Sequence, residues 1–277
     1  MAQERDVEKI SAEVRGKGRR RFLRDMLFFA AALILPPGRR RAFAFAPKGG
    51  TGTYGTGKEF VFAQVAYDGG TWDPEPDAAE SLIRELEGTT SVDAYPRRVV
   101  VRLENPDLFS YPFLYLAGAS DFSPFGEESV ERLGTFLRAG GTLLCDDCGG
   151  TPGYGFDAAI RREMARVYPD APFRRLPSDH TVFKSFFLVR GVGGRRIVSP
   201  FLEGIQVGVR TPVIYSPNGL AGAWSTDADG RWSHTVEPGG ERQRRLAFQI
   251  AINAILYALC ADYKQDRIHL PFLRKKI

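Results

Sequence analysis

FLYLA at residues 113–117, EESVERLGTFLR at 127–138 and TLLC at 142–145 set the architecture that we expect for this chain of 277 residues. The first and third segments are short apolar runs, which are typical of buried strands. The second segment places Leu133 and Leu137 four positions apart, as on the inner face of a helix. A strand, a helix and a strand in this order predict a βαβ unit, with a parallel sheet that helices cover on both faces.

The same alternation extends outward along the chain. We expect further strands at 60–66, 99–103, 186–190 and 213–216, and further helices at 77–87, 157–168 and 242–263. In the last of these helices, Gln249 and Asn253 interrupt an apolar middle, which favours a core helix over a membrane span. The elements predict one α/β domain over residues 59–263, a three-layer sandwich with a mostly parallel sheet, followed by a C-terminal tail at 264–277.

The N-terminal segment, residues 1–46, has the parts of a twin-arginine signal peptide in the expected order. RRRFLR at 19–24 supplies the arginine pair, and AFAFA at 42–46 offers cleavage sites, of which we prefer the one after Ala44. The apolar stretch at 26–35 would span about 15 Å as a helix, which is half of a bilayer's hydrocarbon core. The segment predicts export by the twin-arginine translocase to the periplasm or beyond. The alternatives are an uncleaved membrane tether and a basic amphipathic tail.

The basic charge of the chain belongs to this leader. Residues 1–46 hold 11 of the 38 Lys and Arg residues and 5 of the 33 Asp and Glu residues, which leaves 27 basic and 28 acidic side chains in residues 47–277. A nucleic-acid-binding surface needs an excess of positive charge. The net charge of −1 after the leader therefore argues against nucleic acid as a partner.

PKGGTGTYGTGK at residues 47–58 resembles two phosphate-binding patterns, but its context favours a glycine-rich linker. In both patterns a strand precedes the glycines and a helix follows them, so that the helix N-terminus meets the phosphate. Here the expected strand at 60–66 follows the glycines. Glu59 also occupies the position where a P-loop needs Ser or Thr for magnesium. We therefore expect no nucleotide site in this segment.

The three cysteines, Cys145, Cys148 and Cys260, are few and odd in number, which argues against a scaffold built on disulfides. Cys145 and Cys148 have the C-x-x-C spacing of redox sites, in which the start of a helix lowers the pKa of a thiol. Motifs of that kind follow the first strand of their domain, whereas this pair lies at the end of a later one. We therefore expect Cys145 to be a buried strand residue.

The region from 113 to 150 resembles the core of class I glutamine amidotransferase-like domains. The resemblance rests on a strand that ends in Gly118, a helix, and the run GGTLLCDDCG at 140–149. In those enzymes a G-x-C-x-G turn holds a cysteine nucleophile, and backbone N–H groups near the preceding strand's glycine form the oxyanion hole. The nucleophile position here is taken by Asp147, and Cys148 comes one residue later. The resemblance implies a flavodoxin-like, amidotransferase-like fold without the amidotransferase reaction.

Five separated blocks resemble the bacterial domain of unknown function 4159. They are YDGGTW at 67–72, YPFLYLAG at 111–118, GGTLLCDD at 140–147, LPSDH at 176–180 and VIYS at 213–216. This resemblance implies an amidotransferase-like, flavodoxin-type core and no established activity. In open α/β sheets, ligands meet the C-terminal ends of the strands. The candidate ligand-binding residues at that rim are Asp68, Gly118, Ser120, Asp146, Asp147 and His180.

Asp146, Asp147, Asp179 and His180 allow two interpretations. In the first, they form a carboxylate–imidazole cluster that holds a divalent metal and activates water, with Asp147 and His180 as the metal ligands. In the second, one aspartate caps the following helix, the other accepts hydrogen bonds from loop amides, and His180 is an ordinary polar residue. We favour the second, because neighbouring carboxylates at the end of a strand rarely point the same way.

These observations predict an exported domain that binds a small molecule or an envelope protein at the C-terminal strand ends. No catalytic residue and no cofactor is assigned. The alternatives are a metal-assisted hydrolase that uses Asp147 and His180, and a structural or assembly protein of the cell envelope. Trp72, Trp224 and Trp232 either stack on a sugar or cover nearby loops.

Overall fold

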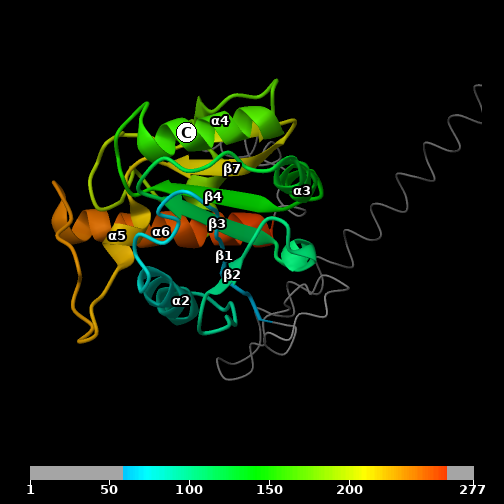
Figure 1. The fold of residues 1–277 in the computed structure, drawn as a ribbon. Helices are drawn as coiled ribbons and strands as arrows, with labels where there is room; N and C mark the ends of the chain where they lie inside the picture. Colours follow the sequence, from blue (N-terminus) through cyan, green and yellow to red (C-terminus); the bar gives the residue numbers. More distant parts are fainter. Residues whose placement is uncertain (1–58, 261–277) are drawn as a thin grey trace, which may run out of the picture. The chain divides into compact units, whose positions relative to one another are not determined.

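Seven strands form one sheet at the centre of the computed structural model, which describes residues 59–260 (Figure 1). The strands are β1 (Ala63–Val65), β2 (Val99–Val101), β3 (Phe113–Gly118), β4 (Thr142–Asp147), β5 (Arg174–Arg175), β6 (Glu203–Val207) and β7 (Arg210–Ser216). Their spatial order is β2-β1-β3-β4-β7-β6-β5. The predicted leader at 1–46, linker at 47–58 and tail at 264–277 lie outside the described residues and remain predictions.

Five neighbouring strands, β2, β1, β3, β4 and β7, are parallel. β6 is antiparallel to β7, and β5 is antiparallel to β6. From β1 the chain crosses to β2 on one side and then returns to β3 on the other side of β1. The strand order therefore reverses between β1 and β3. In parallel sheets such a switch point leaves a crevice at the C-terminal ends of the strands.

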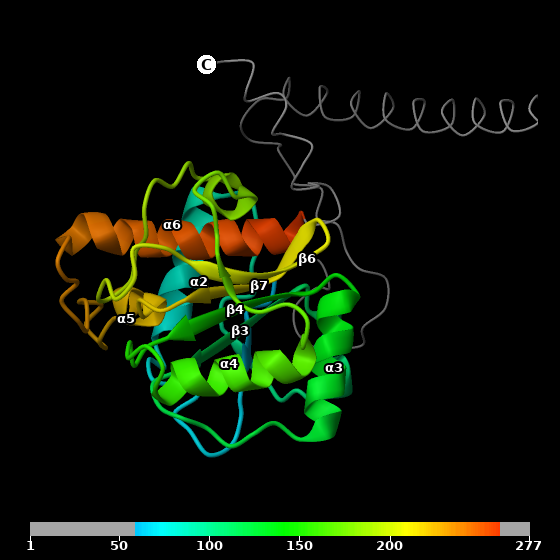
Figure 2. The same ribbon diagram turned by 90° about the horizontal axis from the view of Figure 1, so that it is seen from above.

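Helices cover both faces of this sheet. They are α2 (Ala78–Thr89), α3 (Glu127–Arg138), α4 (Gly155–Val167), α5 (Leu220–Trp224) and α6 (Gly240–Leu259), with short 3₁₀ helices η1 (Pro106–Ser110) and η2 (Thr181–Lys184). The helices α2, α5 and α6 pack on one face, which we call the α6 face, and α3 and α4 pack on the other, the α4 face (Figures 1 and 2). The predicted α/β arrangement with a mostly parallel sheet between helical layers is confirmed.

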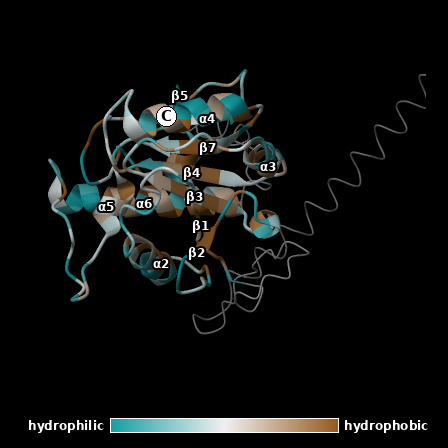
Figure 3. Cartoon of the chain, viewed as in Figure 1, coloured by the Kyte–Doolittle hydropathy of each residue, from teal (hydrophilic) through white to brown (hydrophobic). Residues whose placement is uncertain are grey.

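Each face has its own apolar core because side chains alternate along a strand. In β4, Leu144 packs into the core of the α6 face, whereas Leu143 and Cys145 pack into the core of the α4 face. Figure 3 shows the central strands as hydrophobic and the helices as mixed. On α4, Ile160 and Met164 are buried in the core of the α4 face.

Several elements differ from the sequence-based expectation, which missed β5, β6 and α5 altogether. β4 extends to Asp147, two residues further than predicted. The predicted strand at 186–190 is wrong, because this segment is a loop held by Asn253 of α6. The amides of Phe186 and Phe187 donate to Asn253 Oδ1 over 3.1 and 2.8 Å. Asn253, a polar residue in the apolar middle of α6, therefore anchors a neighbouring loop.

α6 runs along its face of the sheet (Figure 2). Its buried polar residues, Gln243, Arg244 and Asn253, all donate hydrogen bonds to backbone carbonyls of adjoining segments. Buried polar groups need such partners, so these three residues fix the loops that surround the helix. Within residues 59–260, no helix combines the length and the apolar character that a membrane crossing requires.

Candidate functional site

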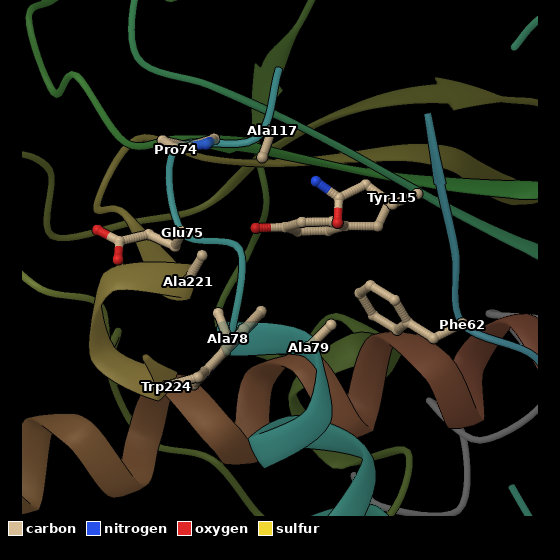
Figure 4. A pocket seen from close by; sticks show the side chains of 10 residues that line it. Phe62, Pro74, Glu75, Ala78, Ala79, Tyr115, Ala117, Ala221 and Trp224 are labelled. Carbon is tan, nitrogen blue, oxygen red and sulfur yellow. The ribbon is translucent and has the colours of Figure 1, made fainter. Parts of the chain in front are cut away.

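A small cavity lies on the α6 face beside the C-terminal halves of β1 and β3, where the strand order reverses (Figure 4). We call it the switch-point cavity. Its lining residues are Phe62, Gln64, Pro74, Glu75, Ala78, Ala79, Tyr115, Ala117, Ala221 and Trp224. The walls therefore come from β1, β3, the loop after β1, the start of α2 and α5. The free space is about that of one water molecule.

Aromatic rings and small side chains shape this cavity. The ring centroids of Phe62 and Tyr115 lie 5.2 Å apart, and those of Tyr115 and Trp224 lie 6.0 Å apart. Tilted ring pairs at such distances hold one another in place. Ala78 and Ala79, in the first turn of α2, face these rings with single methyl groups, which leaves the space open (Figure 4).

Asp146 is fully buried beside the cavity and binds the first turn of α5. Its Oδ1 accepts a hydrogen bond from the Leu220 amide over 2.7 Å. Its Oδ2 accepts from the Ala221 amide and from the Tyr115 hydroxyl, each over 2.8 Å. Because the first amides of a helix lack partners inside it, this carboxylate is a cap. The predicted cap is therefore present, but the helix that it caps is α5 and not α4, the next helix in the chain.

The pKa values of the groups around Asp146 are shifted by burial. Burial raises the pKa of Asp146 to about 6, although hydrogen bonds from two α5 amides and from Tyr115 lower it in part. Burial and then the charge of Asp146 raise the pKa of Tyr115 well above its ordinary value. Burial and then the charges of Asp146 and Glu75 do the same for Cys148. The tyrosine and the cysteine are therefore both protonated at neutral pH.

Glu75 and His234 pair at the solvent side of the cavity and join two loops. The His234 Nε2 lies 2.9 Å from Glu75 Oε2 and 2.8 Å from its Oε1. The side chain of His234 is 25% exposed, and that of Glu75 is 11% exposed. Arg244 positions the loop of His234, because its guanidinium donates to the His234 carbonyl over 2.8 Å and lies 4.3 Å from the Trp232 ring centroid.

The indole of Trp224 is completely buried, and its Nε1 has no hydrogen-bond partner among residues 59–260. A buried N–H group without an acceptor costs about 1–3 kcal/mol, so such groups are rare. Trp224 is also a wall of the switch-point cavity.

Asp147 points to the α4 face and has different partners. Its Oδ1 accepts hydrogen bonds from the amides of Gly149 and Gly150, each over 2.9 Å, and its Oδ2 lies 3.3 Å from the Tyr215 hydroxyl oxygen. The predicted role of one aspartate as an acceptor for loop amides is confirmed. Burial raises the pKa of Asp147, although the same hydrogen bonds oppose that shift.

A network of polar pairs continues from Asp147 across the α4 face. The Tyr215 hydroxyl donates to Asp157 Oδ1 over 2.7 Å, and Arg161 donates to the same oxygen over 2.9 Å. Arg161 also pairs with Glu203 of β6. Burial raises the pKa of Asp157. Hydrogen bonds from Tyr215, the Gly153 amide and Arg161 lower it by more than burial raises it, so the pKa lies below its ordinary value. The network ties α4 to β6 and β7.

Three further predicted residues lie at the same edge as the cavity. Asp68 forms an exposed ion pair with Arg102 over 2.5 Å. Ser120 Oγ accepts a hydrogen bond over 3.1 Å from an amide of the loop after β1, so it joins that loop to the loop after β3. Gly118 is a packing residue, because an added Cβ would lie 2.2 Å from a ring carbon of Phe156. The rim residues therefore hold the loops that surround the cavity.

His180 lies at the opposite edge of the sheet. Its Nε2 is 2.9 Å from Thr211 Oγ1 near the start of β7, whereas Asp146 pairs with Ser216 at the end of that strand. Five strand residues span about 16 Å. The disfavoured alternative, a cluster of His180 with Asp146 and Asp147, is therefore ruled out, and the predicted placement of His180 at the rim is wrong. Within residues 59–260, no three His, Cys, Asp or Glu side chains gather in a way that could hold a metal ion.

Cys148 is a partly buried thiol beside Asp146. Its amide donates to the Gly118 carbonyl over 2.8 Å, and its sulfur lies 3.7 Å from Asp146 Oδ2 while packing against the core of the α6 face. A nucleophilic cysteine needs surroundings that favour the thiolate. Here burial and neighbouring carboxylates raise the thiol pKa instead. Cys145 is fully buried in β4, as predicted.

A comparison with known families adds to this geometry. The model of the family described as Domain of unknown function (DUF4159) matches residues 61–259. The chain belongs to this family. The match extends from β1 to the end of α6 and so includes the cavity and both aspartates of β4. A search of curated proteins gives no match.

The sequence-based candidates did not include Glu75 and His234. These residues are 159 positions apart, so no local pattern connects them. The position of Glu75 in the loop between β1 and α2 could have marked it as a candidate site residue. In a doubly wound sheet that loop borders the switch point, so its polar residues are candidates for ligand contact.

Proposed function

We propose that the domain binds a small molecule at the switch-point cavity and carries out no amidotransferase chemistry. The observation that carries this proposal is a hollow at the switch point of the sheet, lined by the rings of Phe62, Tyr115 and Trp224 and by Glu75. Ligand sites are mostly apolar hollows with a few convergent polar groups. The switch-point cavity has this composition.

The strand order supports a ligand at this position. With β6 and β5 set aside, the order β2-β1-β3-β4-β7 is the 2-1-3-4-5 order of flavodoxin-like sheets. In such sheets the ligand lies outside the C-terminal strand ends at the switch point. We therefore propose a flavodoxin-like core of the amidotransferase-like type, in which Asp68, Gly118 and Ser120 form the outer rim of the site.

The surroundings of β4 support binding rather than thioester chemistry. Asp147 occupies the position of the amidotransferase nucleophile, and its carboxylate is engaged by loop amides. Cys148 has a raised thiol pKa. Both observations disfavour nucleophilic attack by this turn, and we assign no catalytic residue.

A ligand screen by thermal unfolding, with matched cavity variants, tests this proposal. Ala79→Val fills the cavity from α2, and Ala159→Val adds the same atoms to a buried alanine of α4 on the other face. A compound that binds only the folded protein raises its Tm. We expect such a compound to raise the Tm of the wild type and of Ala159→Val, but not that of Ala79→Val.

The screen contains sugars, nucleotides, amino acids and divalent metal salts. If no compound stabilises the wild type, or if both variants respond equally, the proposal is wrong and a structural role in the cell envelope becomes the better account. A response to divalent metal salts alone would mean that the ligand is not a small organic molecule.

We also propose that the domain works outside the cytosol, after export by the twin-arginine translocase. This proposal rests on the arginine run at 19–21, the apolar stretch at 26–35 and the alanine-spaced segment at 42–46. Replacing the three arginines by lysine keeps the charge and removes the motif. We expect the wild type in the exported fraction and the variant in the cytosol. Equal distribution of the two proteins would contradict export by this route.

A further inference from the structure

We infer that the side of α6 that faces away from the sheet, together with the segment that packs on it, docks on the surface of an anionic phospholipid bilayer. We call this region the α6 outer surface, and it consists of Phe186, Leu188, Arg190, Arg242 and Arg245. None of these residues lines the switch-point cavity, so the inference is independent of the ligand proposed there. It rests on exposed apolar side chains and on a local excess of positive charge.

The segment that follows α6 exposes every second side chain (Figure 2). Phe187 and Val189 pack with the core of the α6 face, whereas the alternate residues Phe186 and Leu188 are 47% and 70% exposed. Asn253 holds the backbone of this segment on the helix through its hydrogen bonds with Phe186 and Phe187. The two exposed side chains therefore cannot turn into the core. Neighbouring apolar groups that are fixed in water are typical of an interaction surface.

Three arginines without acidic partners accompany these apolar side chains. Arg190 continues the alternation and is exposed. Arg242 and Arg245 are three positions apart on α6, so they lie on one side of the helix, and both are exposed. The backbone next to Arg190 meets that side, because a Cβ added to Gly191 would lie 3.9 Å from Leu246. None of the three arginines forms an ion pair within the described part of the chain.

The charge around this surface differs from that of the rest of the domain. Residues 59–260 contain 20 Lys and Arg and 26 Asp and Glu residues, a net charge of −6. Two stretches, 190–196 and 237–245, contain six of these basic residues and two of the acidic ones, so they carry +4 and leave −10 for the remainder. The stretches meet in space, because Gln243 donates to the Gly194 carbonyl over 2.7 Å. Such a local concentration of positive charge favours an anionic partner.

The combination of charge and apolar side chains favours a bilayer over a soluble polyanion. A nucleic acid or a polyacidic segment would pair with the arginines and leave Phe186 and Leu188 in water. At the surface of an anionic bilayer, guanidinium groups bind lipid phosphates while neighbouring apolar side chains enter the headgroup region. The bilayer is thus the partner that satisfies both parts of the α6 outer surface.

Hydrogen–deuterium exchange of the full-length chain on vesicles tests this inference. The vesicles contain phosphatidylcholine, either alone or mixed with phosphatidylglycerol, and mass spectrometry measures the exchange of each peptide. We expect the mixed vesicles to slow exchange at 186–196 by about threefold or more, whereas peptides around the exposed Val100 of β2 keep their rates. Because the measurement is local, binding of the N-terminal segment to the same vesicles does not produce this result.

Two triple variants with the same change in net charge identify the arginines that act. The test variant is Arg190→Gln/Arg242→Gln/Arg245→Gln. The control is Arg97→Gln/Arg138→Gln/Arg174→Gln, at exposed positions on other elements. One arginine near an anionic bilayer is worth about fivefold in affinity, so the test variant should need about a hundredfold more lipid for half of the protection. The control should need less than about threefold more, because its arginines lie away from the α6 outer surface.

A second matched pair tests the apolar part. Leu188→Ser removes the most exposed apolar side chain of the surface, and Val100→Ser makes a comparable change on β2. We expect Leu188→Ser to raise the lipid concentration for half of the protection by about fivefold, and Val100→Ser to leave it unchanged.

Four results would overturn the inference. Equal protection on phosphatidylcholine alone would remove the role of charge. Equal loss in the two triple variants would remove the role of the α6 outer surface. If no vesicle slows exchange at 186–196, the surface does not bind a membrane. If polyglutamate slows it in place of the vesicles, the partner is an acidic protein segment instead.

Discussion

Asp146 and Asp147 are neighbours in β4, yet they belong to opposite faces of the sheet. On the α6 face, Asp146 caps the first turn of α5 and contacts Tyr115 and the partly buried Cys148, next to the switch-point cavity. On the α4 face, Asp147 adjoins a network of polar pairs that reaches β6. The alternation of side chains along one strand thus places one carboxylate in a helix cap beside the cavity and the other in a network that ties α4 to β6 and β7.

The difference has a physical origin in the connections that follow the strands. α4 is a helix of 13 residues that covers its face along the sheet and brings charged side chains to Asp147 and Tyr215. α5 has only 5 residues, and its last residue, Trp224, lines the cavity. On the α6 face the switch point is therefore covered by several elements, namely α5, the start of α2 and the loop after β1, which leave a small cavity between them.

The largest expected effect comes from removing each aspartate in turn. Asp146→Ala leaves two α5 amides and the Tyr115 hydroxyl without an acceptor in a fully buried place, which we expect to lower the free energy of unfolding by about 3–5 kcal/mol. Asp147→Ala frees amides of glycines that water can reach, with an expected loss of about 1–2 kcal/mol. Urea denaturation of both variants measures the difference. Equal losses would show that the two faces do not differ as described.

The pH dependence of stability distinguishes the two faces by sign. The pKa of Asp146 is raised to about 6 in the folded protein, so the folded state holds a proton that the unfolded state releases near pH 4. Relative to Asp146→Asn, the wild type should therefore lose about 2 kcal/mol of stability as the pH rises from 4 to 6. Denaturant titrations across this range measure the loss.

Asp157 on the α4 face should behave in the opposite way. Its pKa is lowered, so its contribution to stability is present above pH 4 and is lost as the pH falls below that value. Relative to Asp157→Asn, the wild type should lose stability on acidification. A loss on acidification for both aspartates would contradict the raised pKa of Asp146.

A smaller effect concerns the reactivity of Cys148. Because burial and then Asp146 raise its thiol pKa, we expect alkylation by iodoacetamide at pH 8 to be more than about tenfold slower than that of free cysteine. Asp146→Asn removes the nearest carboxylate charge and should accelerate the reaction more than Asp147→Asn does. Peptide mass spectrometry gives the rate at each cysteine. Alkylation faster than that of free cysteine would restore the interpretation of this turn as a nucleophile elbow.

The fold was largely predictable because it depends on local periodicity. The predicted helix at 127–138 has the observed bounds of α3, and the apolar runs around it became β3 and β4. The predicted strand at 186–190 failed because an aromatic run satisfies a strand pattern equally well when its rings pack against a helix. The tertiary contact with Asn253 decided that case, and no local pattern records it.

The candidate site was predictable only where strand order determines position. Asp146 and Asp147 lie at the C-terminal edge because they end a parallel strand. His180 lies in an irregular segment that enters the sheet from the other edge, and nothing in its sequence block fixes that direction. Glu75 and His234 meet only because Arg244 places the second loop over the first. Such pairs depend on the complete fold.

The smallest expected effect concerns the pair at the mouth of the cavity. Glu75 and His234 are partly exposed, so a double-mutant cycle with Glu75→Gln and His234→Gln should give a coupling energy of about 0.5–1 kcal/mol. The matched pair on the α4 face, Asp157 and Arg161, includes an almost fully buried carboxylate and should be coupled more strongly. Weak coupling at the mouth would allow a ligand to separate the two loops at little expense of stability. Coupling of Glu75 and His234 equal to that of Asp157 and Arg161 would mean that both faces are closed to the same degree, and ligand entry would then need another path.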